Sequence, residues 1–101
     1  MKKIGIIGSG IVAKTLGAGF LKHGYPVMLG TSDKSKLTEW QKGVGANAQV
    51  GSFDETAKFG DIVVLAVKGT AAKKALEGIA GENLAKKTII DTTIQLPMKY
   101  P

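Results

Sequence analysis

The feature that most constrains this chain is a glycine-rich turn near its start, where an apolar run passes into a helical pattern. The turn reads Gly8-Ser9-Gly10-Ile11-Val12-Ala13, a G-x-G-x-x-A pattern that directly follows Ile4–Ile7. In such a turn the first glycine permits a tight change of direction and the second lets the backbone approach a pyrophosphate. The small last residue lets the helix lie close on its strand, and free N–H groups at the positive end of the helix dipole hold the anion. We therefore predict a dinucleotide-binding turn.

Length and composition narrow the class of protein. The 101 residues suffice for one domain with a single core. No apolar stretch approaches the roughly 20 residues of a membrane span, and the start lacks the cleavage site of a signal peptide. The sequence holds no cysteine and one histidine, which excludes disulfides and argues against a zinc site. We expect a cytoplasmic protein with neither a metal nor a membrane partner.

The net positive charge of the chain favours an anionic ligand. A formal net charge of +6 suits a polyanionic ligand. Nucleic acid is the alternative, but the lysines are scattered in pairs rather than gathered in one stripe, and aromatic side chains on which bases could stack are sparse. We interpret the lysines as a solvated surface and expect a dinucleotide rather than a nucleic acid.

Strand and helix patterns alternate along the chain. The predicted strands are Lys3–Ile7, Pro26–Gly30, Gln49–Val50, Asp61–Val67 and Lys87–Asp91, and the predicted helices are Ile11–His23, Lys34–Lys42, a short one from Ser52 through Lys58, and Thr70–Ile79. The β-branched run from Ile62 is typical of a central parallel strand covered on both faces. Crossovers of this length require a parallel sheet with right-handed connections. We predict an α/β fold, a Rossmann-type doubly wound sheet of five strands in the order 3-2-1-4-5.

Three local patterns predict how the helices pack and begin. Gly17 falls one turn after the small Ala13, so we interpret it as a position of close packing. Trp40 is predicted to pack in the core, with stacking on an adenine ring as the alternative. Ser52 and Glu55 are spaced as a capping box, in which each residue satisfies a backbone N–H of the other.

The end of the predicted second strand indicates which nucleotide is bound. NAD-binding domains ordinarily carry a carboxylate there, about 20 residues after the glycines, to bind the ribose 2′-hydroxyl. This chain instead has the run Gly30–Lys36, Gly-Thr-Ser-Asp-Lys-Ser-Lys. The hydroxyls of Thr31 and Ser32 and the charges of Lys34 and Lys36 suit a 2′-phosphate, with solvated lysines as the alternative, so NADP is favoured over NAD. Asp33 is predicted to cap the next helix; contact with the ribose, which would favour NAD, is the alternative.

Several of these motifs together resemble the deazaflavin-dependent NADP reductase family, which includes the NADPH-dependent reductases of coenzyme F-420. The motifs that carry the resemblance are Gly8–Ala13, His23–Val27, Leu29–Ser32, Asp61–Val67 and Ile89–Thr93. The resemblance implies an N-terminal dinucleotide-binding domain. It also implies hydride transfer between the nicotinamide of NADP and a flavin-like or deazaflavin ring, the second substrate.

The same resemblance implies the residues of the site. It assigns the pyrophosphate loop to Ser9, Gly10, Ile11 and Val12, the 2′-phosphate pocket to Thr31, Ser32 and Lys36, and the strand end under the dinucleotide to Ala66 and Val67. The chain departs from the family at Lys68, where proline is usual, and at Ile94-Gln95. Ala66-Val67-Lys68 is also similar to pyrroline-carboxylate reductases.

No catalytic residue is expected. Hydride transfer needs no protein nucleophile, because the cofactor supplies the chemistry and the protein supplies position and the exclusion of water. His23 is predicted to be a surface or helix-end residue rather than a base. The sequence therefore favours the NADP-binding domain of an oxidoreductase, with a non-catalytic dinucleotide-binding or sensor module as the alternative.

The sequence ends soon after the predicted fifth strand. We expect residues 1–101 to be the dinucleotide-binding domain of a truncated protein, without its C-terminal substrate and dimerisation half. Apolar side chains of the fourth and fifth strands and of Ile94–Met98 should then be exposed. Because exposed apolar patches and open strand edges favour association, we expect a homo-oligomer with weak or no hydride transfer.

Overall fold

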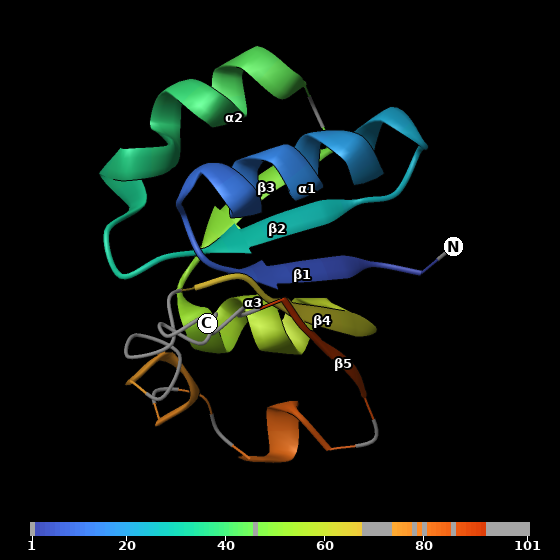
Figure 1. The fold of residues 1–101 in the computed structure, drawn as a ribbon, viewed down its shortest axis with the longest axis vertical. Helices are drawn as coiled ribbons and strands as arrows, with labels where there is room; N and C mark the ends of the chain where they lie inside the picture. The colour runs from blue at the N-terminus through green and yellow to red at the C-terminus, as the bar shows by residue number, and fades with distance from the viewer. Residues whose placement is uncertain are drawn as a thin grey trace, which may run out of the picture.

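Parallel strands form one sheet in the order β3-β2-β1-β4-β5 in the computed structural model, which describes residues 2–45, 47–67, 74–77, 79, 81–85 and 87–92 (Figure 1). The strands are β1 (Ile4–Ile7), β2 (Val27–Gly30), β3 (Ala48–Gly51), β4 (Ile62–Leu65) and β5 (Thr88–Asp91). The helices are α1 (Ile11–Lys22), α2 (Thr38–Val44) and α3 (Phe53–Phe59), with 3₁₀ turns η1 (Lys34–Leu37) and η2 (Gly81–Asn83). The predicted fold class and strand order are confirmed.

The strands pair from their first to their last residues without an offset, so their carboxyl ends share one edge. Ile7 of β1 pairs with Gly30 of β2 and with Leu65 of β4. Gly30 in turn pairs with Gly51, and Leu65 with Asp91. The residues that follow each strand therefore gather along the same edge, where open α/β sheets bind their ligands.

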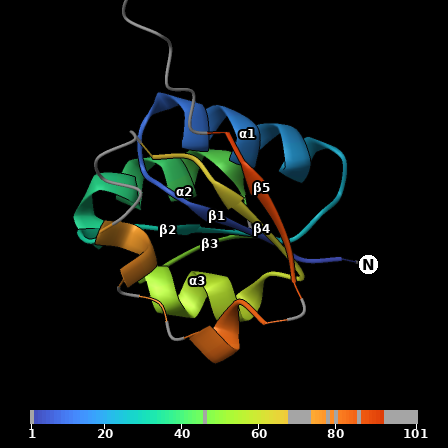
Figure 2. The same cartoon turned by 60° about the horizontal axis from the view of Figure 1, so that its bottom comes forward.

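Helices cover both faces of the sheet. Helices α1 and α2 pack on one face and α3 on the other, as Figure 2 shows from a tilted view. Side chains alternate between the faces as in any strand, so Ile6 joins the core under α1 and Ile7 the core under α3. Val63 and Val64 are each 2% exposed, which confirms that β4 is covered on both faces.

Close approach of α3 to the central strand depends on a glycine. A Cβ placed on Gly5 would lie 2.4 Å from the carbonyl oxygen of Thr56. Thr56 is fully buried, and its hydroxyl donates a hydrogen bond to the Ser52 carbonyl at 2.7 Å. Any side chain at position 5 would therefore displace the backbone of α3.

The other face shows the predicted close packing at Gly17. A Cβ at this position would lie 2.9 Å from both Leu29 and Trp40. Trp40 is partly buried and packs against the core cluster that contains Leu29 and Leu37. The core position predicted for Trp40 is confirmed.

The helix predicted over Lys34–Lys42 is divided into η1 and α2. The Asp33 side chain accepts from the Ser35 N–H at 3.0 Å, and the Asp33 carbonyl accepts from the Lys36 N–H at 3.1 Å. This bonding of residues three apart winds the first turn tightly, as a 3₁₀ turn. The prediction ends this helix at Lys42, whereas α2 continues for two more residues to Val44.

Other predicted boundaries shift by one or two residues, and β4 ends at Leu65 rather than at Val67. Half of the helix predicted over Thr70–Ile79 lies outside the described residues; residues 74–77 are helical. None of the helices in the described part of the chain combines the length and apolarity needed to cross a membrane.

The expected exposure of the last strands is right for β5 and wrong for β4. Ile89 and Ile90 of β5 are 46% and 44% exposed. Val63 and Val64 are buried because β4 lies between β1 and β5 and beneath Ala75 on its second face. The expectation for Ile94–Met98 concerns residues outside those described.

Replacing Gly5 by alanine should destabilise the fold by about 1–3 kcal/mol, the cost of overpacking, because the new methyl group meets the backbone of α3. The matched control is Gly19→Ala on α1, where a Cβ meets nothing within 4 Å. This control should stabilise the protein by about 0.5–1 kcal/mol through helix propensity. Urea unfolding measures both, and equal stabilities of the two variants would contradict the packing of α3 on Gly5.

Candidate dinucleotide-binding site

The glycine turn lies at the carboxyl end of β1, between the ends of β2 and β4. Gly8 has a φ of +148°, and a Cβ there would lie 2.4 Å from the Ala66 carbonyl oxygen at the end of β4. The Gly8 N–H donates to the Gly30 carbonyl at 2.9 Å, and the Ala66 N–H donates to the Ile7 carbonyl at 2.9 Å. The turn is thus tied to the ends of both neighbours of β1. Because β2 continues the chain on one side of β1 and β4 on the other, this is the switch point at which ligands bind.

The first turn of α1 fits a pyrophosphate. Gly10 is the N-cap residue, and a Cβ there would meet nothing within 4 Å. The first turn carries no acidic side chain, and its leading N–H groups have no acceptor within the helix. Ile11 and Val12 are 82% and 55% exposed. Open space, free donors and the positive end of the helix dipole all suit an anion at this point.

The loop after β2 is shaped by a buried threonine. Thr31 is 4% exposed, and its N–H donates to the Gly51 carbonyl at 3.0 Å. Its hydroxyl accepts from the Asp33 N–H at 3.1 Å and donates to the Asp33 carbonyl at 3.2 Å. The hydroxyl predicted to contact a 2′-phosphate is therefore engaged in the loop itself, whereas Ser32 is exposed.

Asp33 acts as the predicted cap. Its carboxylate accepts from the Ser35 N–H at 3.0 Å and from the Ser35 hydroxyl at 2.6 Å. These bonds, the hydroxyl first, hold the pKa of Asp33 below its ordinary value, with a smaller contribution from the charge of Lys36. Lys36 itself is exposed and belongs to no ion pair within the described ranges. The loop therefore presents a lysine that no carboxylate neutralises by direct contact.

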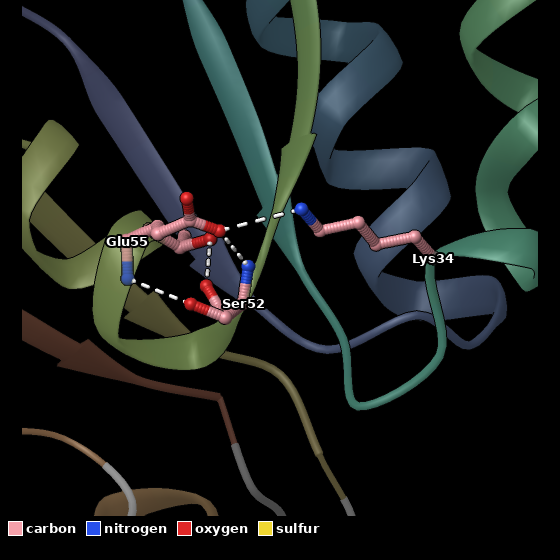
Figure 3. A network of polar contacts seen from close by, with 4 residues as sticks. Lys34, Ser52 and Glu55 are labelled. Carbon is pink, nitrogen blue, oxygen red and sulfur yellow. Dashed lines mark hydrogen bonds and ion pairs between the residues drawn. The ribbon is translucent and has the colours of Figure 1, made fainter.

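A polar network links the loop after β2 to the start of α3 (Figure 3). Ser52 and Glu55 form the predicted capping box, with the Glu55 N–H donating to Ser52 Oγ at 3.1 Å and the Ser52 N–H donating to Glu55 Oε1 at 2.8 Å. Lys34 Nζ lies 3.5 Å from the same Oε1. The bonds with Ser52 and then the charge of Lys34 lower the pKa of Glu55. Sequence reasoning missed this ion pair, although the predicted adjacency of the second and third strands could have suggested it.

The end of β4 is held by hydrogen bonds from Thr92, just after β5, and by packing on both faces of the sheet. The Leu65 carbonyl accepts from the Thr92 N–H at 2.9 Å and from the Thr92 hydroxyl at 2.7 Å. Ala66 packs against the core under α1, and Val67 against the core under α3. The structure thus brings Ala66 directly onto Gly8, and it places Thr31–Lys36 at the neighbouring strand end.

Titratable residues elsewhere have structural roles. His23 is the C-cap of α1, at the opposite edge of the sheet, as predicted for a helix-end residue. Asp61 accepts from the Lys3 N–H at 2.9 Å, and Asp54 accepts from Asn83 at 2.8 Å. Among the residues that the structure describes, no three metal-binding side chains cluster.

A parallel sheet in the order 3-2-1-4-5, with a glycine turn at its switch point, defines a Rossmann-type domain of the NAD(P)-binding reductase class. The chain belongs to the family described as NADP oxidoreductase, coenzyme F420-dependent, whose model matches residues 3–95. The family resemblance predicted from the sequence is confirmed.

Solved structures agree with this assignment. A protein from Arthrobacter sp. FB24, provisionally described as an F420-dependent NADP reductase, is 27% identical with a TM-score of 0.84; 92% of this chain covers 46% of that one. An imine reductase from Aspergillus terreus has 18% identity and a TM-score of 0.79, with 94% of this chain covering 33% of it. A pyrroline carboxylate reductase from Plasmodium falciparum, with NADP bound, has 23% identity and a TM-score of 0.70, with coverages of 91% and 33%.

The last two likenesses show the fold alone, and the chain spans less than half of each of these three proteins. None of the curated proteins compared with the chain matches it.

Ser52→Ala should lower the free energy of unfolding by about 1 kcal/mol, because the variant leaves an N–H at the start of α3 without its acceptor. Glu55→Gln is the matched variant: glutamine retains an oxygen that can accept from the Ser52 N–H, so stability at neutral pH should change little. Thermal or urea unfolding distinguishes the two. A loss for Glu55→Gln as large as that for Ser52→Ala would show that the charge, rather than the capping bond, stabilises α3.

Proposed function

We propose that residues 1–101 form the NADP(H)-binding domain of a cytoplasmic oxidoreductase that transfers a hydride between NADPH and a flavin-like or deazaflavin acceptor. The observation that carries the proposal is the open, acid-free first turn of α1 at the switch point of the sheet. Membership of the NADP oxidoreductase family supports it. So does the fold shared with a pyrroline carboxylate reductase that has NADP bound.

The pyrophosphate of the dinucleotide would lie on the turn Gly8–Val12. Gly10 leaves room for the phosphates, and the backbone N–H groups of the first turn donate to them. The exposed side chains of Ile11 and Val12 flank this position. Ala66 and Val67, at the neighbouring strand end, would support the dinucleotide from below, because the turn at Gly8 rests on Ala66.

The adenosine end would lie at the loop after β2. Gly30 and Thr31 offer no carboxylate to a ribose 2′-hydroxyl, and Asp33 is engaged as a cap. Ser32 and Lys36 are exposed and can donate to a 2′-phosphate, while Thr31 shapes the loop that presents them. Charge-assisted hydrogen bonds of this kind favour NADP over NAD.

The bound nicotinamide supplies the hydride chemistry. The chain contributes position: α1 and the ends of β1 and β4 would hold the dinucleotide along the edge of the sheet. The described part of this edge carries no histidine, and its acidic residues Asp33 and Glu55 serve as helix caps. This is consistent with a domain that orients a cofactor rather than one that supplies a nucleophile.

We also propose that the protein is a homo-oligomer that associates through β5. This strand forms one edge of the sheet, and Ile89 and Ile90 expose nearly half of their surfaces on its opposite faces. An open strand edge with apolar side chains favours pairing with another chain.

NADPH should bind more tightly than NADH, because the loop after β2 offers donors and a cation but no free carboxylate. Lys36→Ala should weaken NADPH binding about five- to thirtyfold, as expected for a lost charge-assisted contact, and leave NADH binding unchanged. Isothermal titration calorimetry measures both constants. Lys22→Ala, at the opposite end of α1, is the control of equal charge and should change neither. Equal losses for both cofactors in Lys36→Ala would remove Lys36 from the phosphate pocket.

NADPH oxidation by residues 1–101 with a flavin or deazaflavin acceptor, followed as loss of nicotinamide absorbance, should be weak or absent, because the chain spans 46% of the similar Arthrobacter protein. Gly10→Ala should reduce the binding of NADPH and NADH, because its methyl group occupies the space left for the phosphates while contacting no protein atom within 4 Å. Rapid oxidation of NADPH with either acceptor would contradict the expected weak activity.

Light scattering at micromolar concentrations should give a dimer or a larger assembly. Ile90→Lys on β5 should shift it toward the monomer, because a lysine ammonium resists burial in an interface. The control is Lys2→Ala, which changes an exposed residue just before β1 and away from β5. A monomeric unsubstituted protein would refute the association.

A further inference from the structure

The ion pair between Lys34 and Glu55 stands at the edge where the adenosine would bind. It joins Lys34 Nζ to Glu55 Oε1 at 3.5 Å. Lys34 lies between Ser32 and Lys36, on the loop whose Thr31 N–H donates to Gly51, the residue before the Ser52 cap. The loop and the start of α3 are therefore neighbours through the backbone as well as through these side chains.

The two partners of the pair differ in mobility. Glu55 is held by the capping box, and the oxygen that faces Lys34 also accepts from the Ser52 N–H at 2.8 Å (Figure 3). Among the residues that the structure describes, Lys34 is held by this contact alone: its side chain is 62% exposed and carries the ammonium on four rotatable methylene groups. The carboxylate is thus fixed, whereas the ammonium can turn toward another anion without movement of the backbone.

A 2′-phosphate would be such an anion. A phosphate monoester carries a charge of about −1.5 to −2 at pH 7, more than a carboxylate, and has more acceptor oxygens. Exposed ion pairs are weak, so the exchange of Glu55 for a phosphate costs Lys34 little. Glu55 remains ionised at neutral pH, because the bonds with Ser52 and the charge of Lys34 lower its pKa.

We propose that Lys34 is a second ligand of the 2′-phosphate, and that Glu55 sets the preference for NADP over NAD by competing with the phosphate for the Lys34 ammonium. The charge of Lys36, by contrast, acts on Asp33, whose pKa it helps to lower. In the free protein Glu55 holds Lys34, and the bound phosphate draws it away. This inference rests on the proposed function and names a specificity-determining residue that makes no contact with the reacting atoms.

Glu55→Gln tests the competition, because glutamine keeps the bond to Ser52 and removes the charge. Calorimetric titration with NADP⁺ and NAD⁺ should show NADP⁺ binding tightened about two- to fivefold, the size expected of one exposed charge pair, with NAD⁺ binding unchanged. Asp61→Asn is the matched control: it removes the same charge at the opposite edge of the sheet and retains an oxygen for the Lys3 N–H. It should leave the ratio of the two constants unaltered.

Lys34→Gln completes a double-mutant cycle. Alone it should weaken NADP⁺ binding about two- to fivefold with no effect on NAD⁺, as for loss of one exposed charge contact. Added to Lys34→Gln, the Glu55→Gln change should give no further gain, because the two anions no longer have a lysine to share.

Three results overturn the proposal: an unchanged ratio of NADP⁺ to NAD⁺ affinity in Glu55→Gln, a gain that persists in the Lys34→Gln background, or an equal gain in Asp61→Asn. Thermal unfolding of each variant without nucleotide checks that the changes in affinity do not arise from changes in stability. Absence of binding of both nucleotides to the unsubstituted protein would instead refute the proposed function, and this inference with it.

Discussion

The rest of the structure depends on two close contacts, in which backbone carbonyl groups of other segments lie against glycines within and just after β1. At Gly5 the strand lies against the Thr56 carbonyl of α3, and at Gly8 the turn lies against the Ala66 carbonyl after β4. A side chain at either position would separate the layers that meet there. The first contact brings α3 down onto the sheet, and the second joins the glycine turn to the end of β4. The candidate site is therefore a product of the same packing that holds the central strand in place.

Much of the fold could be predicted because its determinants are local in the sequence. The glycine turn, the β-branched run of β4, the capping box and the lack of a carboxylate at the end of β2 can each be found in a short window, and together they imply the sheet order. Three features could not be found in this way. The division of the second helix depends on bonds that Asp33 makes with Ser35, and the use of the Thr31 hydroxyl depends on the shape of its loop. The pair of Lys34 with Glu55 requires the strand order and two side-chain conformations at once.

A doubly wound sheet creates an electrostatic conflict at its ligand-binding edge. In such a sheet the helices that follow the strands begin at the carboxyl edge, and helix starts favour acidic residues. Under the proposed function, the same edge must also accept an anionic dinucleotide. Asp33 at η1 and Asp54 and Glu55 at α3 follow the first requirement and place negative charge where the second is least tolerant of it.

The described helices resolve this conflict in two ways. At α1 the cap is Gly10 and the first turn has no acidic residue, so the helix start closest to the switch point keeps its N–H groups and its positive dipole for a ligand. At the other two starts the acids are retained for capping, and a lysine offsets each: the charge of Lys36 acts on Asp33, and Lys34 contacts Glu55. Because these lysines belong to the loop that would hold the 2′-phosphate, the residues that make the acidic caps tolerable are also the cations available to distinguish NADP from NAD. Under the proposed function, stability of the helix starts and selectivity for the nucleotide would thus be coupled through the same two lysines.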